Sequence, residues 1–118
     1  MKNVEHIKYY PTGEILCKYW CLDGKTHRGY ILYYVSGEIS RKSYYINGKI
    51  HGESINYYIS GVISYKCNYL EGKRHGSYIS YYENGDIWSK YYYIDDKFIT
   101  EFEWLCYNRN LTLELLGL

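Results

Sequence analysis

Apolar and polar positions alternate along most of this chain with a period of two. Ile7 and Tyr9 are separated by one residue, and Ile31 and Tyr33 repeat that spacing further along. Side chains two residues apart point to the same side of a β-strand, so the alternation predicts half-buried strands. The apolar segments are short and are separated by glycine-containing turns, which is typical of β-hairpins.

The alternation itself repeats every 24 residues, in four copies without an insertion. Each copy contains a Tyr-Tyr pair, a glycine, a lysine and a second turn. The Tyr-Tyr pairs begin at 9, 33, 57 and 81, the glycines are Gly13, Gly37, Gly61 and Gly85, and the second turns lie at 23–25, 47–49, 71–73 and 95–97. A strict period of this length is the signature of a repeat architecture. We therefore predict a single repeat domain over residues 1–118, with a degenerate C-terminal cap at 105–118.

Two strands per copy predict an all-β protein built as one elongated, twisted antiparallel meander sheet of tandem hairpins. Ten strands are expected, at 5–10, 14–21, 29–34, 38–45, 53–58, 62–69, 77–82, 86–93, 100–107 and 111–116. Asn-Gly and Asp-Gly are the strongest of the turn signals, because both residues tolerate a positive φ. Asp96 replaces glycine in the fourth copy, so that turn should be looser.

The two faces of the predicted sheet differ in polarity. Ile7, Tyr9 and their repeats should form the apolar core face, continued by Ile15 and its repeats on the second strand of each hairpin. The more polar face is expected to carry a ladder of tyrosine and lysine side chains. These residues are Tyr10, Tyr34, Tyr58, Tyr82, Lys18, Lys42, Lys66 and Lys90. Because tyrosine is large, fairly rigid and half polar, we predict that this face is an interaction surface.

The C-terminal segment departs from the repeat and is rich in leucine, although a terminal repeat normally has to be polar to cap an array. As an edge strand it would place Leu111, Leu113 and Leu115 on one face, where a second copy could cover them. We therefore predict a homodimer through this segment. The alternative is a segment that folds back as a lid, as a short helix capped by Asn110 with Gly117 after its end.

The stretch Tyr-Leu-Glu-Gly-Lys-Arg-His-Gly at 69–76, echoed by Tyr-Ile-Asn-Gly-Lys-Ile-His-Gly at 45–52, resembles the MORN repeat. The resemblance covers residues 9–104. It is closer to the 24-residue variant of YwqK-type putative antitoxins and of many repeat proteins of giant amoebal viruses. The second glycine of the usual pattern is absent here, since Ser54 and Tyr78 stand at that position. The resemblance implies an elongated sheet that acts as a scaffold, often dimeric, with phospholipid binding in some members.

Charge does not single out a ligand class. The net charge is +1, although residues 1–80 carry 11 basic and 6 acidic side chains and residues 81–118 carry 3 basic and 7 acidic ones. Nucleic acid is not expected as a partner, and anionic membrane lipid stays open but is not favoured. The first residues lack an apolar run, so we expect no signal peptide and a soluble, intracellular protein, in the host cytoplasm or the virion if the protein is viral.

Histidines recur at one position of the repeat, at His27, His51 and His75. Successive copies should lie roughly 9–10 Å apart across two strands, too far to share one zinc ion. We expect these histidines to pack or hydrogen-bond beside a turn. Pairs such as Cys67 with His51 or His75 match no nucleophile motif, so neither an enzyme activity nor a cofactor is predicted.

These features together favour a non-enzymatic scaffold that associates with itself or binds a protein through its tyrosine-rich face. Two alternatives stay open. The first is an antitoxin-like or regulatory binder of one specific protein, and the second is a peripheral binder of anionic lipid.

Overall fold

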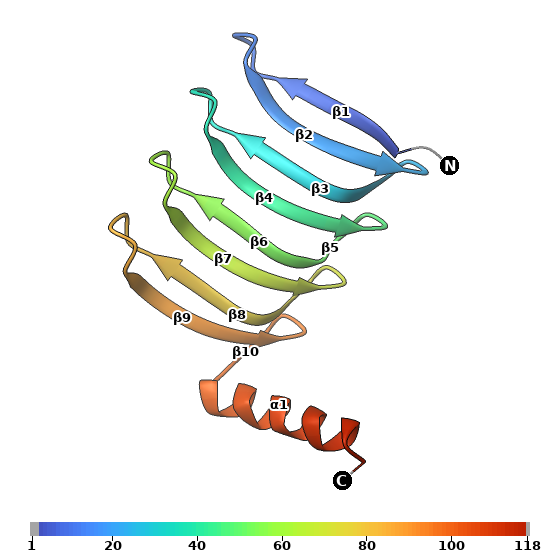
Figure 1. Cartoon of the computed structure of the whole chain (residues 1–118), viewed down its shortest axis with the longest axis vertical. Helices are drawn as coiled ribbons and strands as arrows, with labels where there is room; N and C mark the ends of the chain where they lie inside the picture. Colours follow the sequence, from blue (N-terminus) through green and yellow to red (C-terminus); the bar gives the residue numbers. More distant parts are fainter. Residues whose placement is uncertain (1–2, 118) are drawn as a thin grey trace.

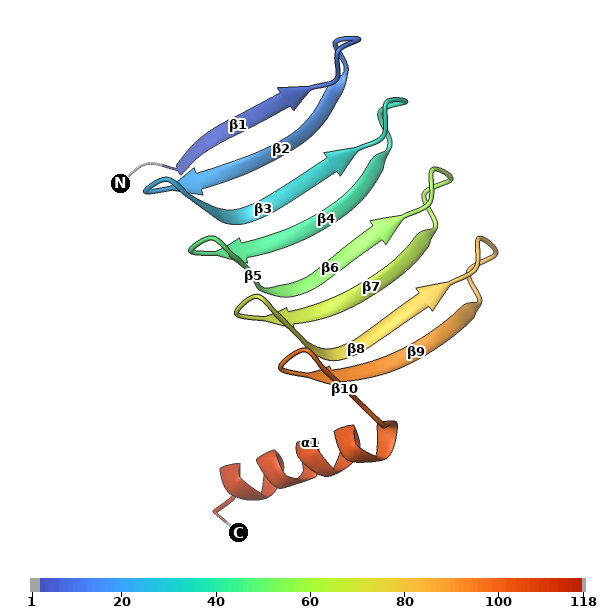
Figure 2. The same cartoon turned by 180° about the vertical axis from the view of Figure 1, so that it is seen from behind.

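The computed structural model describes residues 3–117, which form one antiparallel sheet followed by a helix (Figure 1). The elements, in chain order, are β1 (Asn3–Tyr9), β2 (Ile15–Leu22), β3 (Lys25–Tyr33), β4 (Ile39–Ile46), β5 (Lys49–Ile50), β6 (Gly52–Tyr57), β7 (Ile63–Leu70), β8 (Lys73–Tyr81), β9 (Ile87–Ile94), β10 (Lys97–Ile99) and α1 (Glu101–Leu115). The strand order is β1-β2-β3-β4-β6-β7-β8-β9-β10, with β5 paired to β4. The sheet is open, and Figure 2 shows its hairpins stacked along one direction.

The predicted meander is confirmed for the four repeats. The expected strands from residue 5 to residue 93 correspond to β1 to β9, although β3 and β8 begin four residues earlier than predicted. Pairing resumes directly after each second turn, because that turn has only two central residues. Asn47 and Gly48 have φ of 49° and 83°, the two positive values that a type I′ turn requires.

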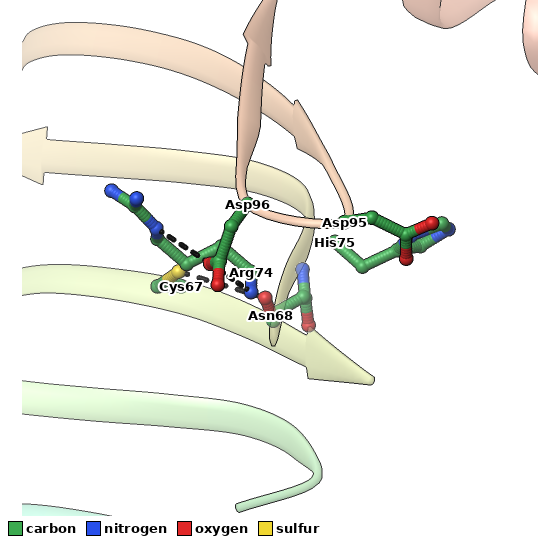
Figure 3. A network of polar contacts seen from close by, with 6 residues as sticks. All are labelled: Cys67, Asn68, Arg74, His75, Asp95 and Asp96. Atoms are coloured by element: carbon green, nitrogen blue, oxygen red, sulfur yellow. Dashed lines mark hydrogen bonds and ion pairs between the residues drawn. The ribbon is translucent and has the colours of Figure 1, made fainter. Parts of the chain in front are cut away.

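The predicted looseness of the fourth turn is wrong. Asp95 and Asp96 adopt φ of 48° and 68°, so the turn keeps its type I′ form without glycine. The Asp96 carboxylate accepts hydrogen bonds from the Arg74 backbone N–H at 2.8 Å and from Arg74 Nε at 3.1 Å (Figure 3). The Asp96 backbone N–H donates to the Arg74 carbonyl at 3.0 Å. These three bonds fix a residue that is otherwise unfavourable at positive φ.

The strands predicted at 100–107 and 111–116 are also wrong, because this segment is the helix α1. Thr100 is its N-cap: the hydroxyl accepts from the Glu103 backbone N–H at 3.1 Å, and the Glu103 carboxylate accepts from the Thr100 backbone N–H at 3.2 Å. This capping box begins a helix where a fifth repeat would continue the strand that starts at β10. Asn110 lies inside the helix rather than at its start, and Gly117 follows its end with φ of 75°.

A β-bulge in every repeat reverses the predicted placement of the lysines. Lys8 pairs with Cys17 and Tyr9 pairs with Ile15, so Leu16 is an extra residue on β2. The bulges recur at Ser40, Ser64 and Trp88. Side chains of paired residues lie on the same face. Lys18 therefore shares its face with Ile7 and Ile31, which are its direct partners, rather than lying opposite them.

The molecule is one sheet thick and buries little. Its extents are 56 × 43 × 20 Å, and its radius of gyration is 17.2 Å, against about 13.5 Å for a compact domain of this length. Among residues 3–117 the buried apolar side chains are Cys17, Cys67 and Tyr92. Short-range pairing within and between hairpins, rather than a deep core, holds this fold together.

Candidate interaction surfaces

The register defines two faces. The tyrosine face carries the row Tyr19, Tyr30, Ser43, Ser54, Cys67, Tyr78 and Tyr91, together with the rows two residues to either side. The lysine face carries the row Ile7, Lys18, Ile31, Lys42, Ile55, Lys66, Ile79 and Lys90, together with its flanking rows.

Stacked rings lie at two places on the tyrosine face. Tyr19 and Tyr30 are parallel at a centroid distance of 5.2 Å, and Tyr65 and Tyr78 are parallel at 5.4 Å. Further ring pairs extend these two stacks towards His6 and Tyr45 at one end and towards Tyr93 and Phe98 at the other. Because neighbouring rings restrict one another, the face presents a large aromatic area at a low cost in side-chain entropy.

Two serines separate the stacks. Ser43 and Ser54 are buried, and their hydroxyl oxygens lie 3.0 Å apart. Arg41 Nε donates to Ser43 Oγ at 3.0 Å, so the buried hydroxyls are satisfied. The strands contribute no carboxylate to the tyrosine face among the described residues, which gives it a basic and aromatic character.

Burial raises the pKa of several tyrosine and cysteine side chains on this face. It raises the pKa of Tyr30 to about 12 and, with the nearby Cys67, raises the pKa of Tyr69 to about 12. Burial also raises the pKa of the Cys67 thiol, whose Sγ donates to the Asn68 carbonyl at 3.6 Å. A thiol held in its protonated form is a poor nucleophile.

The lysine face alternates cations with isoleucines. Lys66 Nζ lies 6.0 Å from the ring centre of Tyr81, and Lys90 Nζ lies 5.5 Å from that of Tyr92. Lys42 and Lys90 are exposed, whereas Lys18 and Lys66 are half-buried. The lysine stems thus cover isoleucine and tyrosine surface on this side of the sheet.

The recurring tyrosines predicted as an interaction surface make a structural contact in three of four copies. The hydroxyl of Tyr10 donates to the carbonyl of Tyr33 at 2.6 Å, Tyr34 donates to Tyr57 at 2.5 Å, and Tyr58 donates to Tyr81 at 2.6 Å. Each bond links one repeat to the next. Tyr82 is the exception: it is 51% exposed, lies near Trp88, and its hydroxyl has no acceptor within residues 3–117.

The histidines lie beside turns. His27 Nδ1 accepts from the Asn47 backbone N–H at 3.4 Å, and His51 Nδ1 accepts from that of Glu71 at 3.5 Å. The expected hydrogen bond beside a turn is therefore confirmed for these two. His75 Nδ1 lies 4.0 Å from the Asp95 carboxylate (Figure 3). In the part of the chain that the structure describes, no three His, Cys, Asp or Glu side chains lie close enough to hold one metal ion.

The apolar side chains of the C-terminal segment lie on the helix α1 and not on the predicted edge strand. Trp104 stacks on Tyr92 of the lysine face at 5.8 Å and meets the His75 ring edge-on at 5.8 Å. Tyr107 also meets the His75 ring edge-on, at 5.6 Å, whereas Phe102 is 74% exposed and Leu115 is 87% exposed. The pair Thr100 and Glu103 was the sequence signal for this helix, and the leucine pattern obscured it. Leu111, Leu113 and Leu115 therefore do not share a strand face.

Within residues 3–117 no helix combines the length and the apolarity needed to cross a membrane. No family model matches the chain, and searches among curated proteins and among solved structures return no match.

Proposed function

We propose that this protein is a non-enzymatic, MORN-like repeat scaffold whose tyrosine face binds a protein partner. The observation that carries the proposal is the amount of surface left uncovered. The chain exposes 8057 Å², against about 6,800 Å² for a compact monomer of its mass. The excess is more than the roughly 800 Å² that one partner contributes to a standard protein interface.

Chemistry favours the tyrosine face over the lysine face as the binding surface. Tyrosine and arginine are the residues enriched at interface hot spots, and Arg41 lies between the two ring stacks with no carboxylate within 4 Å among the described residues. On the lysine face each lysine instead interrupts the isoleucines, and strongly hydrated ammonium groups oppose burial.

A matched pair of variants tests this choice. Tyr91 on the tyrosine face and Tyr44 on the lysine face are both 45% exposed. In a partner capture from the native cell, Tyr91→Ser should lose the captured protein, whereas Tyr44→Ser should retain it. The reverse result, or an equal loss, would contradict the assignment of the face. A capture with no specific protein in any variant would count against the binding function itself.

Self-association is a second form of this binding, supported by the exposed side chains of α1. Phe102 and Leu115 of α1 and Leu116 at its C-cap are all more than half exposed, and a second copy could cover them. Light scattering after size exclusion should give twice the chain mass of 14.2 kDa, and Phe102→Ser with Leu115→Ser should return it to the monomer. A monomer at micromolar concentration would contradict self-association.

The row of lysines on the lysine face favours one further candidate, the binding of anionic lipid headgroups. Flotation with vesicles containing phosphatidylserine tests it. The triple variant Lys42→Ser, Lys66→Ser and Lys90→Ser should then lose flotation, and binding that persists in the triple variant would contradict this role.

A further inference from the structure

The junctions between repeats follow one pattern. The second strand of each repeat pairs with the first strand of the next, at β2–β3, β4–β6 and β7–β8. At each junction a lysine lies opposite an isoleucine: Lys18 with Ile31, Lys42 with Ile55 and Lys66 with Ile79. At each junction a tyrosine hydroxyl also donates to a carbonyl of the next repeat. The fold thus uses the same three contacts each time it adds a repeat.

The two ends of the array present the two halves of a further junction. On β9, residues 87–91 are not paired with β10. Within residues 3–117, Lys90 therefore has no isoleucine opposite it on this edge, and the Tyr82 hydroxyl has no carbonyl acceptor of the kind that its equivalents in the other repeats have. At the other end, β1 is exposed along its whole length. Its Ile7 and the carbonyl of Tyr9 stand at the repeat positions that Lys90 and Tyr82 would contact.

Residues 6–9 of β1 from a second copy would therefore fit the free stretch of β9 at residues 87–91, with Ile7 opposite Lys90. Charge also favours this arrangement, because residues 1–80 have five more basic than acidic side chains and residues 81–118 have four more acidic than basic ones. The opposite net charges of the two ends attract in a head-to-tail contact, whereas a symmetric contact between two copies of the same end brings like charges together.

The helix α1 stands in the way of that contact. The chain pairs with β9 at residues 97–99, as the start of β3 pairs with β2, and then leaves the edge at the Thr100 capping box. Figures 1 and 2 show α1 lying beside β9, on the side where the next strand of the sheet would lie. A cleft of about 110 Å³ lies at this place and is lined by Lys90, Tyr92 and Glu101 among others.

We propose that α1 blocks the edge of β9 and that the strand it prevents from pairing there is β1 of a second copy. With α1 docked through Trp104, the junction is closed. With α1 undocked, copies join head to tail. A contact of this kind does not close on itself, so the product is a filament with one continuous sheet. This inference goes beyond the proposed partner binding and does not depend on it.

A cross-link between copies tests the proposal in the full chain. Ile7→Cys and Lys90→Cys are introduced together, with Cys21→Ser and Cys106→Ser to remove the other incompletely buried thiols. Directly paired residues have Cα atoms about 4.5–5.5 Å apart, within the range of a disulfide. Since β1 and β9 lie at opposite ends of the sheet, a bond between residues 7 and 90 can form only between two chains.

Undocking is achieved with Trp104→Ala and Tyr107→Ala, which remove the ring contacts of α1 with Tyr92 and His75. Under mild oxidation these changes should raise the yield of cross-linked oligomers, as a ladder of chain multiples, by about tenfold or more over the docked background. A tenfold change corresponds to about 1.4 kcal/mol of lost helix docking. Leu105→Ala, at an exposed residue of the same helix, is the matched control and should leave the yield unchanged.

Three results would overturn the proposal. The first is an undocked variant without a ladder, when its far-ultraviolet circular dichroism shows an intact sheet. The second is an equal ladder of cross-linked oligomers in the docked background, which would show that α1 does not block the edge of β9. The third is a dimer from Ile7→Cys alone, which would show that β1 pairs with another β1.

Should Trp104→Ala with Tyr107→Ala fail to fold, a second variant is available. Thr100→Ala with Glu103→Ala weakens the start of α1 without removing those rings and should also raise the yield of cross-linked oligomers. Because the readout is the bond between residues 7 and 90, failure of partner capture at the tyrosine face would not affect it.

Discussion

Tyrosine has three different roles in this chain. Tyr34 links two repeats through its hydroxyl, Tyr30 stacks in a ring cluster and has a raised pKa, and Tyr91 exposes 45% of its surface. The residue type is the same, but its neighbours decide whether the hydroxyl meets a carbonyl, a ring or solvent. A residue that recurs at one repeat position is therefore as much a sign of a structural contact as of a binding surface.

The hydroxyl links between repeats predict a measurable difference between two chemically equal substitutions. Tyr34→Phe removes the bond to the Tyr57 carbonyl and should lower the free energy of unfolding by about 0.5–1.5 kcal/mol. Tyr82→Phe removes a hydroxyl with no acceptor in the described part of the chain and should leave it unchanged. Urea unfolding measures both. Equal effects would mean that the links contribute nothing to stability.

At the scale of elements, the hairpins are determined by their turns and the faces by the bulges. The type I′ turns place two residues at positive φ and set the register of the following strand. The bulge at Leu16 and its repeats then changes which residues share a face. An element-level description that lacks the bulge assigns the strands correctly and the surfaces incorrectly.

Valine in a second turn should destabilise the protein. Gly48 and Gly72 have φ of 83° and 87°, which a β-branched residue adopts only with strain. Gly48→Val and Gly72→Val should each lower the free energy of unfolding by about 1 kcal/mol or more. Lys49→Val, on the exposed residue beside the same turn, is the control and should have a smaller effect. Unchanged melting temperatures for both glycine variants would contradict the turn assignment.

Removing three lysines together should leave the sheet intact. Lys42, Lys66 and Lys90 lie opposite isoleucines on the lysine face, and no ion pair involves them within residues 3–117. The triple serine variant should keep the circular dichroism spectrum of the parent protein. Loss of the spectrum would show that the lysine stems are needed to cover the isoleucines beneath them.

On the scale of the whole molecule, a single layer replaces a core. The chain reaches 56 Å in length at a thickness of 20 Å, and its stability is spread over similar junctions between neighbouring hairpins. Repeat proteins of this kind are stabilised by contacts between nearest neighbours, so both ends matter more than in a globular domain. One end here is the open edge of β1, and the other is covered in part by α1.

Global stability should fall at alkaline pH. The pKa values of Tyr30 and Tyr69 are raised to about 12 in the folded chain, above the value of about 10 expected after unfolding. The folded state therefore binds more protons between these values, and the stability that both phenols contribute is complete below pH 10 and is lost as the pH rises towards 12. Urea midpoints measured at pH 9 and pH 11 should show the decrease. Tyr30→Phe with Tyr69→Phe should reduce it, and an unchanged slope would contradict this source of the pH dependence.

The sequence by itself determined the repeat, its two strands per copy and its turns, because these depend on local preferences: alternating side chains and residues that tolerate positive φ. The tertiary structure alone decided three further features. The bulges moved Lys18 and its repeats onto the isoleucine face, because cross-strand hydrogen bonds set the register there and the alternation does not reveal an extra residue. The Tyr10 series became links between repeats, because their hydroxyls reach carbonyls 23 residues away. The last segment became α1, because the Thr100 capping box and the stacking of Trp104 on Tyr92 outweighed the strand-like alternation of its leucines.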